Sequence, residues 1–250
     1  MTGQPGPTPH LLEAHDLQLL DGGERLLCPT LDLRGPTIAL WGRAAWLVHA
    51  FRRPTLRIGG ALKCRSLDAA TALRQRELGY VTRRLEAQPG ARVTATLRAS
   101  AELLGVSPKR AEQQLEKLGL GALGRRRLDE LTPSEERLVA LAHGLLGEPV
   151  VLLIEDPFLG LDERGCERVE HAFLGELRGH SWLWTVESST RAAQAVLDRA
   201  SQVVRAEGER LVGPLLAREI SPLAFWLALE RPAPPELIEQ LRQESASVDL

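Results

Sequence analysis

The stretch that most constrains the fold of this chain is VVLLIEDPFLGLD, residues 150–162. Its apolar run leads directly into Glu155 and Asp156, and a proline follows at once. A short continuous apolar run that ends in turn-forming residues is typical of a strand buried on both faces. Carboxylates at the end of such a strand are placed to hold a metal ion or to polarise a water molecule. The stretch therefore predicts an α/β fold with a candidate acid site at one strand end.

The rest of the chain alternates between strand and helix patterns. Strands are expected within 11–40, near 56–60, at 78–81 and 181–186, and in the hairpin pattern of 201–214. Residues 92–146 instead carry apolar positions at helical spacing, and a further helix is expected at 163–178. This order predicts a mostly parallel sheet with an antiparallel β subdomain and an inserted α-helical subdomain.

Composition narrows the class of partner and compartment. The 31 basic and 33 acidic residues give a formal charge of −2, which provides no general attraction to nucleic acid. Three widely spaced cysteines and six scattered histidines form no disulfide framework and no metal-binding spacing, which favours a reducing compartment. The start resembles no signal peptide, and the apolar runs are shorter than the roughly 18 residues of a spanning helix. We expect a cytoplasmic chain that binds no metal and no nucleic acid.

Residues 131–162, LTPSEERLVALAHGLLGEPVVLLIEDPFLGLD, resemble without a gap the signature helix, Walker B strand and D-loop of ABC transporter nucleotide-binding domains. Residues 51–60, 78–84 and 197–212 fall where that family has the strand after its P-loop helix, its Q-loop and its closing hairpin. The resemblance implies a P-loop-NTPase-like ABC ATPase domain at 11–213, with a helical subdomain at about 88–135. A flexible tail at 1–10 and a C-terminal helical extension at 214–250 are expected to flank it.

The position of the phosphate loop departs from the family's pattern. A P-loop needs glycines whose N–H groups surround phosphates, a lysine, and a Ser or Thr for magnesium. Here GRAAWLVHAF, residues 42–51, has one glycine, no lysine and no Ser or Thr, and it is about five residues shorter than the motif. Gly42 and Arg43 are the remaining candidates for a weak phosphate contact, and a turn filled by Trp46 is the alternative.

The acid pair also departs from the pattern. The family has Asp, which holds the magnesium shell, followed by Glu, which polarises the water, whereas this chain has Glu155 followed by Asp156. A misplacement of about 1 Å costs roughly 100-fold in rate. We expect this degenerate Walker B pair to be inactive and to meet an arginine or a helix N-terminus.

The remaining motif positions are altered as well. Thr132, Pro133, Ser134 and Glu135 stand at the family's LSGGQ signature, where Pro133 removes one N–H donor and the sequence predicts a helix-capping box. Arg83 stands at the Q-loop glutamine, and we expect it to pair with Glu155 or Asp156 in place of the metal. The switch histidine corresponds to Glu187 or Ser188, and Leu161 and Asp162 keep the D-loop pattern of the dimer face.

These departures predict a degenerate, non-hydrolysing subunit that is the structural or regulatory half of an ABC transporter and has no cofactor. Its expected partners are a membrane permease and a second, competent ATPase subunit, which would hold it at the cytoplasmic face of the membrane. Two alternatives remain open. One is an active or residual ATPase subunit with ATP and magnesium, in which a partner supplies the P-loop and this chain supplies Thr132 and Asp162. The other is a soluble interaction protein outside transporters.

Overall fold

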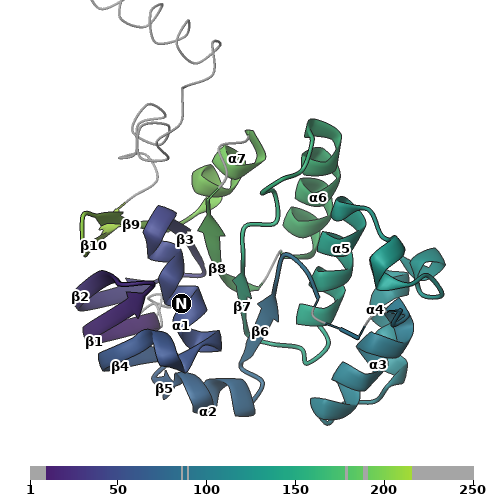
Figure 1. Ribbon diagram of the computed structural model, residues 1–250, viewed down its shortest axis with the longest axis horizontal. Helices are drawn as coiled ribbons and strands as arrows, with labels where there is room; N and C mark the ends of the chain where they lie inside the picture. The colour runs from purple at the N-terminus through teal and green to yellow at the C-terminus, as the bar shows by residue number, and fades with distance from the viewer. Residues whose placement is uncertain (1–9, 86, 89, 178–179, 188–190, 216–250) are drawn as a thin grey trace, which may run out of the picture.

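The computed structural model describes residues 10–85, 87–88, 90–177, 180–187 and 191–215 (Figure 1). The predicted N-terminal tail lies outside the described residues, with the exception of His10. Ser188 and the part of the C-terminal extension after Leu215 also lie outside them. The predicted domain boundaries stay predictions.

The strands form one ten-stranded sheet in the order β5-β4-β1-β2-β10-β9-β3-β8-β7-β6. From β9 to β6 all neighbouring strands are parallel, whereas β5, β4, β1 and β2 pair antiparallel. This arrangement confirms the predicted fold class. The strands are β1 (His10–Asp21), β2 (Glu24–Arg34), β3 (Thr37–Trp41), β4 (Arg57–Cys64), β5 (Leu67–Asp68), β6 (Leu78–Val81), β7 (Val151–Ile154), β8 (Ser181–Val186), β9 (Gln202–Glu207) and β10 (Arg210–Leu215).

The hairpin of β1 and β2 follows from its turn residues. Gly22 and Gly23 both have positive φ, at 56° and 90°, which is the backbone that a two-residue hairpin turn requires. Along β1, buried leucines alternate with polar side chains. One face of this region is therefore buried and the other meets solvent.

Helices cover both faces of the parallel region, as the predicted buried strand requires. Successive side chains of a strand point to opposite faces, so Trp41 and Trp184 belong to one core, and Leu40 and Leu183 belong to the other. The core that contains the tryptophans is covered by α5 (Pro133–Gly144), α6 (Glu163–Glu176) and α7 (Arg191–Arg199). The other face is covered by α1 (Trp46–Arg52) (Figure 1).

The inserted helical region lies beyond the β6 edge of the sheet, where Figure 1 shows α3 and α4 beside α5. It contains α3 (Val93–Leu103) and α4 (Lys109–Lys117), followed by the short turns η3 (Gly121–Leu123) and η4 (Leu128–Glu130). Two short turns, η1 (Gly42–Ala45) and η2 (Pro54–Leu56), and the helix α2 (Ala69–Arg74) complete the described elements. None of the helices in the described part of the chain is long and apolar enough to cross a membrane.

The topology brings distant segments of the chain to one edge. Strands β3, β8, β7 and β6 are parallel neighbours, and Trp41 pairs with Val186, Ile154 with Trp184, and Val81 with Ile154. Because the carboxyl ends of parallel strands meet at one edge, the residues that follow each strand gather there. This edge holds the candidate site.

Candidate functional site

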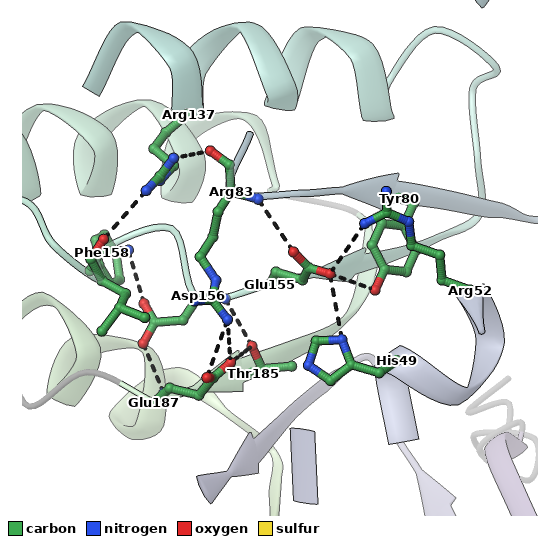
Figure 2. A network of polar contacts seen from close by, with 11 residues as sticks. His49, Arg52, Tyr80, Arg83, Arg137, Glu155, Asp156, Phe158, Thr185 and Glu187 are labelled. Carbon is green, nitrogen blue, oxygen red and sulfur yellow. Dashed lines mark hydrogen bonds and ion pairs between the residues drawn. The ribbon is translucent and has the colours of Figure 1, made fainter. Parts of the chain in front are cut away.

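Glu155, the first acid after β7, is held by donors from three segments (Figure 2). Its Oε1 accepts a hydrogen bond from the Tyr80 hydroxyl at 2.9 Å and lies 3.6 Å from His49 Nδ1 and 3.8 Å from Arg52 Nη1. Its Oε2 accepts from the main-chain N–H of Arg83 at 3.4 Å. The carboxylate is therefore surrounded by groups of the protein itself.

This environment keeps Glu155 ionised. Burial alone would raise its pKa, but the hydrogen bonds from His49 and Tyr80 outweigh that effect and lower the pKa to about 2. An efficient general base has a pKa near the working pH, so a carboxylate stabilised to this degree is a weak base. The contacts suit Glu155 for structure better than for proton transfer.

Asp156, the second acid, is fully buried and ties two loops together. Its Oδ1 accepts from Phe158 N at 2.9 Å, and its Oδ2 accepts from Glu187 N at 2.8 Å. Its own N–H donates to Thr185 Oγ1 at 2.8 Å. The turn after β7 is thereby fixed to the end of β8.

Arg83 contacts the acid site, although its side chain has a different partner from the one expected. Its guanidinium Nη2 donates to both carboxylate oxygens of Glu187, at 3.0 and 3.2 Å. The expectation of a salt bridge to Glu155 or Asp156 is therefore corrected to Glu187. The backbone leaves β6 with its N–H toward Glu155, which sends the side chain across to the end of β8. The Q-loop and switch positions thus bind each other directly.

Arg137 joins this site to the neighbouring helices. It comes from the buried face of α5, where burial lowers its pKa. Its Nη1 donates to the main-chain oxygen of Arg83, and its Nη2 donates to that of Leu159 at 3.4 Å. One side chain therefore connects the segment after β6, the helix α5 and the loop before α6.

The segment expected to bind phosphate forms the tight turn η1 and then α1. Gly42 has a φ of 59°, and Arg43 is directed to main-chain oxygens of Arg25 at 2.9 Å and Gly208 at 3.2 Å. The Arg43 guanidinium also lies 5.1 Å from the ring centroid of Trp46, within the range of a cation–π contact. The Arg43 guanidinium is thus engaged with main-chain oxygens and an aromatic ring of the protein itself.

The signature-like segment forms the start of α5, and the predicted capping box is present. Thr132 Oγ1 accepts from Glu135 N at 3.4 Å, and Glu135 Oε2 accepts from Thr132 N at 2.9 Å. Pro133 occupies the first turn, where a missing N–H costs nothing. The Ser134 hydroxyl lies 3.4 Å from that of Thr132, and Thr132 is exposed. This helix start therefore carries an exposed Thr132 beside a half-buried Ser134.

The D-loop residues begin the next helix. Asp162 caps α6 by accepting from Gly165 N at 2.8 Å, and Leu161 packs partly buried against the main core. Their predicted place on a dimer face is not tested by a single chain.

Comparison with known proteins places this geometry in context. No family model matches the chain. The energy-coupling factor transporter ATP-binding protein EcfA of Methanoculleus marisnigri is 31% identical over 144 residues, which are 56% of this chain and 51% of EcfA. The lipoprotein-releasing system ATP-binding protein LolD of Maricaulis maris is 28% identical over 204 residues, which are 76% of this chain and 87% of LolD. Both relatives of this chain are ATP-binding proteins by name. The chain spans about half of the length of EcfA.

Solved structures agree on the ABC ATPase fold. The structure of cbiO1 from Clostridium perfringens, described as part of the ABC transporter complex cbiONQ, has a TM-score of 0.68 at 17% identity over 84% of this chain and 90% of cbiO1. The ATP-binding cassette MJ1267 in its ADP conformation has a TM-score of 0.67 at 14% identity over 93% of this chain and 98% of the cassette.

These relatives overturn one expectation. The prediction that the chain has no cofactor is wrong, because the proteins to which it is similar are ATP-binding proteins. ATP with magnesium is therefore the cofactor to be considered for this fold. The residues at its own phosphate-loop position nevertheless do not fit a triphosphate in the way that the motif requires, since Arg43 points to main-chain oxygens and Glu155 is held by protein donors.

Sequence reasoning missed five side chains of the site, which are those of His49, Arg52, Tyr80, Arg137 and Thr185. A signal was present for two of them. His49 and Arg52 are three apart on α1, so they share a helix face, and that helix follows β3 at the acid-bearing edge. Tyr80 and Arg137 gave no such signal, because they belong to other elements and reach the site only through tertiary packing.

Proposed function

We propose that this chain is a subunit of an ABC transporter and energises transport jointly with a second subunit. The complete P-loop of the second subunit binds the ATP that is hydrolysed. A membrane permease holds both subunits at the cytoplasmic face. The ABC ATPase fold and the names of the relatives support the transporter setting. A role outside transporters has no support from these relatives.

One observation carries the division of labour. The acid half of the site is closed by protein contacts, since Glu155 is bonded to Tyr80 and close to His49, while Arg83 binds Glu187. The start of α5, by contrast, is regular and exposes the hydroxyl of Thr132. We therefore assign this chain a donor role toward a phosphate bound by the partner.

In this role, Thr132 and Ser134 contact the partner's ATP, and Asp162 lies at the contact between the two subunits. The dipole of a helix favours negative charge at its N-terminus, where these hydroxyl groups lie. ATP with magnesium supplies the free energy for transport. This chain's own residues hold the start of α5 in place, and Arg137 fixes that helix to Arg83 and to the loop before α6.

The competing function is hydrolysis in this chain's own pocket, and the relatives' names as ATP-binding proteins favour it. That function would require Glu155 or Asp156 to act on a water molecule. Hydrolysis in this chain's own pocket needs the acids of this chain. The donor role needs the acids and the P-loop lysine of the partner subunit instead.

The test is the ATPase activity of the intact complex, in which this chain is purified together with its permease and its P-loop-bearing partner subunit. We expect Glu155→Gln to leave turnover within about twofold, and replacement of the partner's P-loop lysine to reduce it by about 100-fold or more. Thr30→Ala on an exposed position of β2 is the matched control. A loss of turnover in Glu155→Gln, with the complex still assembled, would show that this chain hydrolyses ATP itself.

A further inference from the structure

A hollow lies at the edge of the sheet opposite to the acid site. It has a volume of about 950 Å³ and is bounded by α6, the C-terminal end of α7 and the first residues of β3 and β8. Its lining is mainly apolar and includes Pro36, Leu174, Leu177 and Trp182. A neighbouring hollow of about 790 Å³ between α6 and α7 shares Glu167, Glu170 and Arg199 with it. We call the two together the α6–α7 groove.

The last described strand, β10, ends near this groove. In β10, Leu215 pairs with Val203 of β9, and Val203 pairs with Ala39 of β3. Thr37, two residues before Ala39, lines the groove. Neighbouring strands are about 4.8 Å apart and residues along a strand about 3.3 Å apart, so Leu215 lies roughly 12 Å from Thr37 at the β3 strand end that borders the groove. Residues 216–250 therefore start next to it.

The sequence after Leu215 has the composition that such a groove would accept. Residues 223–229, LAFWLAL, are uninterrupted apolar residues that include Phe225 and Trp226. One basic and one acidic residue flank them on each side, Arg218 and Glu219 before and Glu230 and Arg231 after, so the flanks carry no net charge. A continuous apolar stretch of this kind is costly to leave in water. The groove offers apolar side chains for its centre and acids at its border, among them Glu163, Glu167, Glu170 and Asp198. The apolar content of the segment thus matches the apolar lining of the groove.

We propose that residues 223–229 of the same chain bind in the α6–α7 groove, where they cover the half-buried Leu174. The contact is formed within one chain and lies away from the acid-bearing edge. It therefore stands independently of the function proposed above.

Site-specific photocrosslinking tests the position directly. The photoreactive residue p-benzoylphenylalanine is introduced at Trp226 of the full chain, with the same residue at Ser247 as the matched control. After irradiation, we expect peptide mapping to place the Trp226 crosslinks within one chain, on residues 163–177, 181–182 or 191–199. Crosslinks from Trp226 to another copy, to another surface, or no more often than those from Ser247 would overturn the proposal.

A double-mutant cycle tests the energetics. We expect Leu174→Ala and Trp226→Ala each to lower the melting temperature by about 3 °C or more, and the double variant to fall clearly short of the sum, because the two side chains share one contact. Leu103→Ala, on a leucine of α3 that is 90% exposed, is the control and is expected to be additive with Trp226→Ala. Full additivity of Leu174→Ala with Trp226→Ala would contradict the contact.

Discussion

Two halves of the same sheet edge differ in how their polar groups are used. In the acid half, Glu155, Asp156 and Glu187 each bind donors from the protein, so the strand ends are fastened to one another. In the helix-start half, α5 and α6 are capped by Thr132 and Asp162, and Thr132 is exposed. The difference suggests that one half now stabilises the fold while the other remains able to meet a ligand.

The most severe way to break the acid half is to remove Asp156. Asp156→Ala leaves the N–H groups of Phe158 and Glu187 without this acceptor in a buried place. Each such orphaned donor costs about 1–3 kcal/mol, so we expect a loss of about 4 kcal/mol in the free energy of unfolding, measured by urea denaturation. Asp129→Ala, which removes an exposed acid of η4, is the control and should change the free energy of unfolding far less. Equal effects of the two variants on the free energy of unfolding would show that the hydrogen bonds accepted by Asp156 do not stabilise the fold.

The next largest effect is the pH dependence of Glu155. Its pKa is about 2 in the folded protein and 4.5 in its ordinary state, so the ionised form stabilises the fold by on the order of 3 kcal/mol above pH 4.5. Because the folded value is the lower one, this stabilisation is lost as the pH falls from about 4.5 to about 2. The measurement is the stability difference between the wild type and Glu155→Gln as a function of pH. We expect the difference to shrink over this window, and a constant difference would contradict the hydrogen-bonded carboxylate.

The ion pair between Arg83 and Glu187 sharpens the comparison further. Both side chains are about 30% exposed, at 30% and 29%, so solvent weakens their attraction. We expect a coupling energy between about 1 and 2 kcal/mol from the cycle of Arg83→Gln and Glu187→Gln, and partial recovery in the charge swap Arg83→Glu with Glu187→Arg. A coupling near zero would mean that the Q-loop and switch positions are not fastened to each other in solution.

The sequence predicted the architecture well and the site contacts only in part. Apolar runs and helical spacing are local signals, so the buried strand β7, the helix α6 and the capping box at Thr132 were predictable. The ion-pair partner of Arg83 was not, because it depends on how the backbone leaves β6 relative to β8, which is a tertiary property. Tyr80 could not be connected to Glu155 for the same reason, since 75 positions separate the two residues.

The smallest expected change in stability tests the helix-start half and separates its two roles. Thr132 caps α5, and replacing such a cap by alanine costs about 1 kcal/mol, whereas aspartate is an equally good cap. Thr132→Ser should therefore preserve both stability and the ATPase activity of the complex, because it keeps the cap and the hydroxyl. Thr132→Asp should preserve the melting temperature but reduce the ATPase activity by about tenfold or more, since it places a negative charge where the partner's phosphate is proposed to bind. If Thr132→Asp turned over ATP as fast as Thr132→Ser, the start of α5 would have a structural role only, and the contrast between the two halves of the edge would not extend to ligand binding.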